Sequence, residues 1–409
     1  MQIMTRRAVA LLVVLAIVGG AGFIARPYAH GLSFVIRAAN IQGPARQIAD
    51  LDTGRISQRE MEIPTPRGPL RARVYEPARG ARRTTLLVSG LHPSGIDEPR
   101  LVGLATQLSS SGIAVVTPDI PELSQLAITP AITDSIEQAA SWLAAQPQFA
   151  PDGTIGMMGI SFSGGLSVVA AGRPSLRNHV AYVFAFGGHA DLPRVLKYLC
   201  TGLEPAPPDS VSPLNAVPLK PNAKPVTSSR FAEVPAPHDY GVAVILLGVA
   251  DRMVPEPQVV PLRNAVWRFV LASALDTVDK PKAQQEFQAL RELAKTMPDP
   301  AGTLLKYVND RDVVHLGSRL VQWVGFYGDA PALSAARSPK PSAPVFLLHG
   351  TEDNVIPAAE SQHLAAQLMG ATPVRLLLSG LISHAEADRP VHVRDVMDMA
   401  SFWGDLLDR

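Results

Sequence analysis

The chain has 409 residues, enough for one large domain with an insertion or for two domains. Its 37 basic and 36 acidic residues nearly balance, so the composition gives no indication of a nucleic-acid partner. The single cysteine, Cys200, excludes a disulfide within the chain and a cysteine-rich metal site.

The first distinctive stretch is apolar. Ala8–Ala25 carries no charge and follows Arg6 and Arg7. As a helix this run of about eighteen residues would be about 27 Å long, close to the hydrocarbon thickness of a bilayer. The pattern favours an uncleaved membrane anchor within residues 1–30. A cleaved signal segment ending near Ala21-Gly22-Phe23, or a buried helix, are the alternatives.

Two arginines before the apolar run predict that the short N-terminus is cytoplasmic. The rest of the chain is then expected on the periplasmic or extracellular side, anchored to the membrane, or secreted if the segment is cleaved. Residues 31–56 are predicted to be an amphipathic linker. Within it, Leu32–Ile48 carries Arg37 and Arg46 and is suited to lie along a membrane surface.

From residue 57 the pattern of polar and apolar residues is typical of a folded domain. Arg59–Ile63 and Leu70–Tyr75 alternate polar and apolar residues around a turn, which predicts an antiparallel hairpin. Short apolar runs then alternate with helical periods, in the order Thr84–Val88, Pro99–Ser111, Ile113–Val116 and Thr129–Gln146. This alternation predicts a mostly parallel sheet covered by helices on both faces.

The next strand leads directly into a serine-containing turn. Thr154–Met158 is a short apolar run, and Gly159-Ile160-Ser161-Phe162-Ser163-Gly164-Gly165 follows it. A small, apolar helix continues to Gly172. A strand, a serine on a sharp turn and a helix together form the pattern of a nucleophile elbow, with Ser161 as the nucleophile. A shifted register with Ser163 as nucleophile, or a turn without chemistry, are the alternatives.

The regular alternation stops after another strand, Val180–Phe186. Residues 191–337 are predicted to form a mainly helical cap that covers the site, and a separate helical domain is the alternative. Three helices are expected in it, at Tyr240–Met253, Val259–Ala274 and Lys282–Thr296. Nine prolines within residues 201–238 indicate a loop or wrapping segment.

The sheet pattern resumes near the C-terminus. Pro344–Leu348 is predicted to be a strand, and the loop after it contains Asp353. A helix, a last strand and a loop with His384 follow, and then a closing helix that ends near Leu407. The order Ser, Asp, His is that of a hydrolase triad on a parallel sheet.

Residues 57–190 and 338–409 resemble the α/β-hydrolase superfamily, and the segments around the elbow are most similar to dienelactone-hydrolase-like and esterase members. The departure is Ser163, where the elbow pattern usually has glycine. The resemblance implies a triad of Ser161, Asp353 and His384. It also implies an oxyanion hole built from the backbone N–H groups of Phe162 and Leu91.

Other residues compete for these roles. Asp251 has the same spacing to a following proline as Asp353, but no strand and histidine come after it, so it is expected to end a cap helix. Asp191 follows the strand after the elbow, where some superfamily members carry the acid. His92, beside Leu91, either lines the pocket or packs its own loop, and the loop role is favoured.

The resemblance implies a serine hydrolase that cleaves an ester or related acyl bond of a small molecule through an acyl-enzyme intermediate. No metal or organic cofactor is expected. A serine hydroxyl is a poor nucleophile at neutral pH, so the histidine must accept its proton and the aspartate must orient the imidazole. An acyltransferase with the same triad, or a non-catalytic binding protein on the same fold, are the alternatives.

Overall fold

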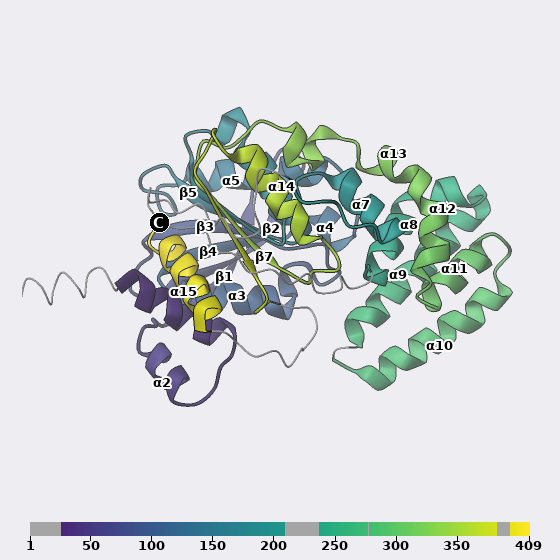
Figure 1. The fold of residues 1–409 in the computed structure, drawn as a ribbon, viewed down its shortest axis with the longest axis horizontal. Coiled ribbons are helices and arrows are strands. Elements are labelled where there is room, and N and C mark those ends of the chain that lie inside the picture. Colours follow the sequence, from purple (N-terminus) through teal and green to yellow (C-terminus); the bar gives the residue numbers. More distant parts are fainter. Residues whose placement is uncertain (1–25, 209–236, 277, 383–392) are drawn as a thin grey trace, which may run out of the picture.

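The computed structural model describes residues 26–208, 237–276, 278–382 and 393–409. Within them, an eight-stranded sheet forms the centre of the molecule (Figure 1). Its strands are β1 (Ile56–Ile63), β2 (Leu70–Pro77), β3 (Arg83–Val88), β4 (Ile113–Pro118), β5 (Ile155–Ile160), β6 (Val180–Phe186), β7 (Val345–Gly350) and β8 (Val374–Ser379). The strand order across the sheet is β1-β2-β4-β3-β5-β6-β7-β8.

The predicted mostly parallel sheet is confirmed. β1 pairs antiparallel with β2, and β2 pairs antiparallel with β4. Every other pairing in the sheet is parallel. The carboxyl ends of β3 to β8 therefore meet along one edge, where the loops after them come together.

Helices cover both faces of the sheet, as expected. One face carries α3 (Pro99–Ser110) and α15 (Val393–Leu407), and the other carries α5 (Ala131–Ala144), α6 (Phe162–Ala171) and α14 (Ala358–Leu368). Successive strand residues point to opposite faces, so Leu86 and Leu87 of β3 belong to different hydrophobic clusters. Burial on both faces explains why these strands are apolar throughout rather than alternating.

The described parts of residues 191–337 are mainly helical. The helices are α7 (Leu192–Thr201), α8 (Asp239–Met253), α9 (Glu256–Leu275), α10 (Lys280–Thr296), α11 (Ala301–Asn309), α12 (Val313–Leu320) and α13 (Val324–Gly328). They form a projection at one end of the molecule (Figure 1). Buried side chains of α7, α8 and α9 join the hydrophobic cluster on the α5 and α6 side of the sheet. The cap thus shares its apolar core with the sheet domain.

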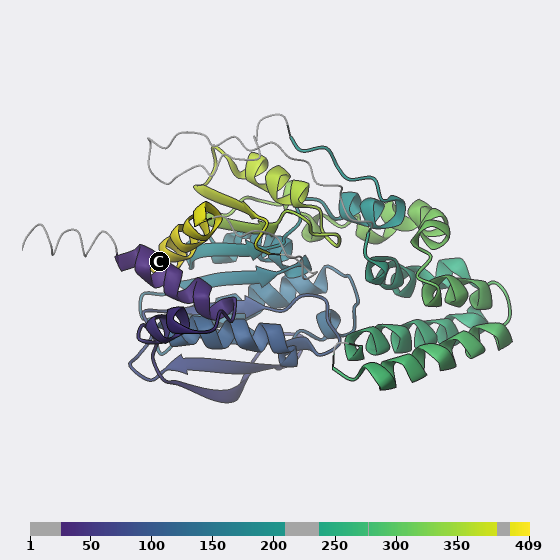
Figure 2. The same cartoon turned by 60° about the horizontal axis from the view of Figure 1, so that its bottom comes forward.

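A helix over residues 26–38 packs beside α15 at the end of the molecule opposite the cap (Figure 2). Two glycines permit this contact. A Cβ on Gly31 would lie 1.9 Å from the Ala400 carbonyl oxygen, and one on Gly404 would lie 2.3 Å from the Pro27 carbonyl oxygen. The helices therefore approach backbone to backbone.

Side chains of this helix enter the core. Phe34 is fully buried, and its ring lies 4.3 Å from that of Trp403. The guanidinium of Arg37 is buried and donates to the side chains of Gln107, Ser110 and Ser111 near the end of α3. Residues 31–56 were expected to form an amphipathic linker, but this part of them is integrated into the fold. The folded unit consequently begins before the hairpin, not near Ile56.

No helix among residues 26–208, 237–276, 278–382 and 393–409 is long and apolar enough to cross a membrane. The predicted span, Ala8–Ala25, lies outside the described residues. The membrane-spanning helix in the predicted fold therefore finds no support in this structure.

The buried position of Phe34 yields a stability prediction. Phe34→Ala should lower the free energy of unfolding by about 3–5 kcal/mol, because it leaves a cavity between α15 and the sheet. Ile48→Ala is the matched control: Ile48 is 70% exposed, and its loss should change stability by less than about 0.5 kcal/mol. Urea denaturation of both variants measures the difference. Equal stabilities would show that helix 26–38 adds nothing to the fold.

Candidate active site

Ser161 occupies the turn between β5 and α6 in a conformation that few residues adopt. Its backbone angles are φ 56° and ψ −127°. A positive φ is unfavourable for any residue with a Cβ, so the position stores strain of about 1–3 kcal/mol. The Ser161 N–H donates to the Phe186 carbonyl of β6 at 2.6 Å, and the Gly164 N–H donates to the Ser161 carbonyl at 2.8 Å. These two bonds hold the turn from both sides.

Glycines allow strand, turn and helix to approach this closely. A Cβ on Gly159 would lie 2.2 Å from the Ser163 carbonyl oxygen, and a Cβ on Gly164 would lie 2.9 Å from the Gly188 Cα. Larger residues at either position would force the backbone apart. The small residues that marked this stretch in the sequence are therefore required by the tight turn.

Ser163 is fully buried inside α6. Its hydroxyl donates to the Ser89 carbonyl at 2.5 Å. A serine in place of the usual glycine thus adds a hydrogen bond between the elbow and the loop that follows β3. The positive φ of the turn is at Ser161, whereas Ser163 lies within α6.

The two segments that carry the expected oxyanion donors both lie next to Ser161. Phe162 is the first residue of α6, and Leu91 lies one residue beyond Gly90 in the loop after β3. A Cβ on Gly90 would be only 3.4 Å from Ser161 Cβ, so this loop passes directly beside the serine. Within the described chain, neither the Leu91 nor the Phe162 N–H donates to a protein acceptor. Two uncommitted N–H groups beside a serine suit stabilisation of an oxyanion.

Asp353 lies in the loop between β7 and α14. Its Oδ1 accepts hydrogen bonds from the backbone N–H groups of Val355 and Ile356 at 2.9 and 3.0 Å. Its Oδ2 would lie 3.5 Å from a Cβ on Gly187, and that same Cβ would be 3.9 Å from Ser161 Cα. The aspartate and Ser161 therefore both border Gly187.

A buried histidine beneath the acid loop escaped the sequence analysis. His349, the penultimate residue of β7, is fully buried. Its Nε2 lies 2.8 Å from the Ile356 carbonyl and its Nδ1 lies 2.6 Å from the Ser361 hydroxyl. Both ring nitrogens are thus occupied by the turn itself. His349 fixes the loop that carries Asp353.

His384, the expected base, lies outside the described residues. The described segment that precedes it ends two positions earlier, at Ile382. A Cβ on Gly350 would be 2.5 Å from the Ile382 carbonyl oxygen, so the loop after β8 starts against the acid loop. The role of His384 stays a prediction.

The structure combines this strand order with an antiparallel β2 and a strained serine between β5 and α6. The loop that carries Asp353 follows β7, in the chain order expected for the acid. This chain has the α/β-hydrolase fold. Residues 56–186 and 345–407 supply the described strands of that fold and the helices that cover them, and the cap is inserted between β6 and β7.

No protein-family model and no curated protein matches the chain. Among solved structures, an esterase from Pyrobaculum calidifontis aligns with a TM-score of 0.40 and 16% identity over 94% of this chain and 92% of that one. Dienelactone hydrolase from Anabaena variabilis aligns with a TM-score of 0.37 and 12% identity, over 86% and 96%. Acylaminoacyl peptidase from Pyrococcus horikoshii aligns with a TM-score of 0.37 and 12% identity, over 79% of this chain and 36% of that one.

The rival acids are engaged elsewhere. Asp251 lies near the end of cap helix α8 and pairs with Arg263 at 2.9 Å. Asp191 caps the N-terminus of α7 by accepting from the Arg194 N–H at 3.0 Å. His92 is half-buried, and its Nδ1 accepts from the Ser94 N–H at 3.1 Å, which fits a role within its own loop. Burial lowers the pKa of His92 below its usual value.

The start of cap helix α8 touches both loops that border Ser161. The Tyr240 hydroxyl donates to the Leu91 carbonyl at 2.8 Å. The His238 N–H donates to the Asn354 carbonyl, next to Asp353, at 2.9 Å. Burial raises the pKa of Tyr240, which keeps the phenol protonated and able to donate. The cap thus bridges the expected oxyanion loop and the acid loop.

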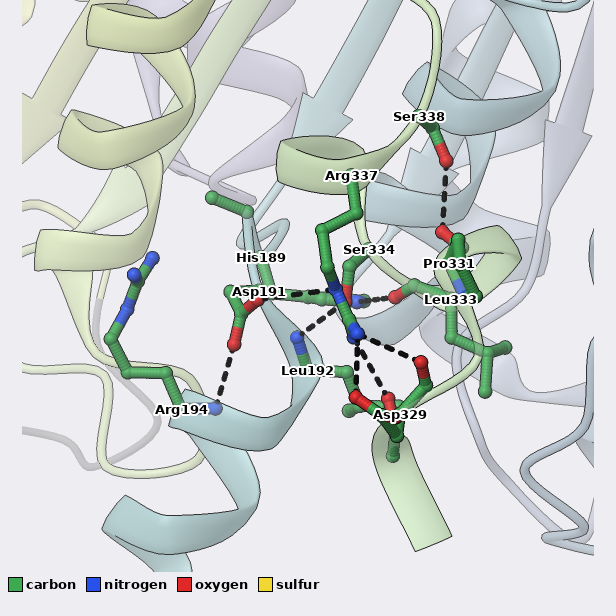
Figure 3. Close-up of polar contacts among 12 residues, drawn as sticks. His189, Asp191, Leu192, Arg194, Asp329, Pro331, Leu333, Ser334, Arg337 and Ser338 are labelled. Carbon is green, nitrogen blue, oxygen red and sulfur yellow. Dashed lines mark hydrogen bonds and ion pairs between the residues drawn. The ribbon is translucent and has the colours of Figure 1, made fainter. Parts of the chain in front are cut away.

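The chain crosses from the core into the cap and later crosses back. The two crossing segments lie together and are joined by polar contacts (Figure 3). Glu360 of α14 is fully buried and accepts from the N–H groups of Ala190 and Asp191 at 2.9 and 3.0 Å. The Arg194 guanidinium binds both of its oxygens. Nearby, the Ser334 hydroxyl accepts from the Leu192 N–H at 3.0 Å, which joins the two crossings.

A cleft of about 460 Å³ opens between the cap and the core. Its walls are largely apolar and come from the segment before α5 and from the cap; they include Leu126, Ile128, Leu247, Trp267 and Tyr327, with Gln125, Arg263 and Asn264 as polar members. Its lining includes neither Ser161 nor Asp353, so this cleft is separate from the proposed catalytic residues. Among the described residues, no group of three or more His, Cys, Asp or Glu side chains is arranged to hold a metal ion.

Proposed function

We propose that this chain is a serine hydrolase that cleaves an ester or related acyl bond through Ser161, Asp353 and His384. The observation that carries the proposal is the strained backbone of Ser161 between two uncommitted N–H groups. A serine without chemistry has no need of a positive φ, and the strain persists only because the surrounding bonds enforce it.

The proposed reaction uses each part of the site. His384 accepts the Ser161 proton as the hydroxyl attacks the acyl carbon, and Asp353 orients the imidazole and stabilises its charged form. The tetrahedral oxyanion is bound by the N–H groups of Leu91 and Phe162. His384 then protonates the leaving group, which leaves an acyl-serine. Water, activated by the same histidine, releases the acid.

The nucleophile can be tested by substitution. Ser161→Ala should lower the hydrolysis of p-nitrophenyl esters by up to about 10⁶-fold and abolish labelling by a fluorophosphonate probe. Ser163→Ala is the matched control, since it removes only the hydrogen bond to Ser89 and should leave most activity. A dead Ser163→Ala protein beside an active Ser161→Ala protein would move the nucleophile to position 163.

The acid is tested in the same assay. Asp353→Asn should lower kcat by about 10⁴-fold, because the amide favours the wrong imidazole tautomer. Asp191→Asn should be mild, since asparagine also caps a helix, and Asp251→Asn removes only a surface pair. A severe defect in Asp191→Asn together with an active Asp353→Asn protein would assign the acid to residue 191.

We further propose that residues 1–25 attach the hydrolase to a membrane, with its fold on the periplasmic or extracellular side. The uncharged run Ala8–Ala25 behind two arginines supports this. Exposed apolar side chains on and around α2 (Pro44–Asp50), near helix 26–38, add support: Ile48 is 70% and Leu51 85% exposed.

Fractionation tests the anchor. The full chain should sediment with membranes and resist alkaline extraction, whereas a chain that starts at Arg26 should be soluble and active. Protease added to intact spheroplasts should degrade the hydrolase. A full-length protein that retains Met1 and stays in the soluble fraction would refute the anchor. A mature N-terminus between Ala21 and His30 would instead show a cleaved signal and a secreted enzyme.

A further inference from the structure

His189 lies where the core passes into the cap, three residues after the end of β6. Its side chain is fully buried. The Nε2 atom lies 2.8 Å from the carbonyl oxygen of Leu333, in the segment that returns from the cap (Figure 3). A carbonyl can only accept, so Nε2 carries the proton. Burial lowers the pKa of His189, which favours this neutral form.

The face of the His189 ring contacts Phe162. The His189 ring stacks on the Phe162 ring with centroids 5.2 Å apart and an interplanar angle of 11°. Phe162 directly follows the strained Ser161, and its N–H is one of the two proposed oxyanion donors. The imidazole therefore touches the cap through one atom and the elbow through its face.

The packing leaves the ring little freedom. A Cβ on Gly165 of α6 would lie 2.7 Å from His189 Nδ1 and 2.4 Å from the His189 carbonyl oxygen, so helix and histidine are in close contact. Within the described chain, Nδ1 has no hydrogen-bond partner. The orientation of the ring thus depends on a single hydrogen bond, to Leu333, and on contact with Phe162 and α6.

We propose that His189 is a positioning residue that couples the seating of the cap to the oxyanion N–H of Phe162. The proposal rests on the hydrolase function proposed above. The strain at Ser161 favours relaxation of the turn, and any relaxation rotates the peptide group that carries the Phe162 N–H. The packed side chain of Phe162 opposes this rotation. His189 is hydrogen-bonded to the Leu333 carbonyl and holds the Phe162 ring in place by stacking on it.

Two substitutions separate the two contacts. His189→Phe keeps an aromatic ring against Phe162 but removes the donor to Leu333. His189→Gln keeps an N–H donor but removes the ring. Ser334→Ala is the matched control, because it removes neighbouring bonds at the crossing, from the Leu192 N–H and the Arg337 guanidinium, without touching Phe162. Active sites are counted by fluorophosphonate titration, so that misfolded protein does not enter kcat.

The readouts are kcat and KM for p-nitrophenyl butyrate and the inhibition constant of a trifluoromethyl ketone, whose hemiketal oxyanion occupies the proposed hole. Both His189 variants should lower kcat by about tenfold or more, which is less than the 10²–10³ lost with an oxyanion donor itself. The inhibition constant should rise in parallel, while KM changes by less than about threefold. Ser334→Ala should match the unmodified protein.

Several results would overturn the role. His189 variants whose titrated sites keep kcat and inhibition within about twofold of normal would exclude it. So would a Ser334→Ala protein impaired to the same extent, since general loosening of the cap would then be the cause. If the His189 variants do not fold, Phe162→Leu removes the stack from the other side and must show the same loss. Absence of labelling at Ser161 in the unmodified protein would refute the hydrolase function itself, and this role with it.

Discussion

The positive φ of Ser161 is the constraint on which the rest of the site depends. A residue with a Cβ adopts it only where its surroundings leave no alternative. Here the surroundings are a hydrogen bond to Phe186 of the neighbouring strand, the first turn of α6, and glycines that bring strand and helix into contact. Ser163, the departure from the usual elbow pattern, contributes a bond to the Ser89 carbonyl and so ties the elbow to the loop of the second proposed donor.

The junction between cap and core adds a buried charge to the apolar core that the two parts share. Removing a carboxylate such as Glu360 from water is costly, and its bonds to Arg194 and two backbone N–H groups largely offset that cost rather than exceed it. What such a group provides is a defined geometry, because no other arrangement of the crossing satisfies it. A junction of fixed geometry suits a cap that must present particular atoms to the site.

The sequence predicted the parts of the molecule that rest on local pattern. Apolar runs gave the strands, helical spacing gave α8, α9 and α10, and the small residues around Ser161 indicated the elbow. The sequence did not predict contacts between residues that lie far apart along the chain. Phe34 packs against Trp403, and Ala190 donates to Glu360, across intervals that leave no periodic signal. The sequence pattern divides the helix over residues 26–38 between the predicted N-terminal segment and the predicted linker, because the packing of its apolar face depends on the distant α15. The roles of His189 and His349 are not visible in the sequence, because a buried histidine has no sequence pattern that distinguishes it from an exposed one.

Both ends of the cap reach the proposed oxyanion hole, and they reach different donors. At the start of α8, the Tyr240 hydroxyl binds the carbonyl of Leu91. At the return, Leu333 holds His189, which stacks on Phe162. The Tyr240 hydroxyl and the His189 Nε2–H are both already engaged within the protein, so neither is free to bind the oxyanion itself. The cap thus contacts the Leu91 carbonyl directly and reaches the Phe162 side chain through His189. Under the proposed mechanism, the cap is therefore part of the frame around the two oxyanion donors, and a change in its seating is expected to alter the site as well as access to it.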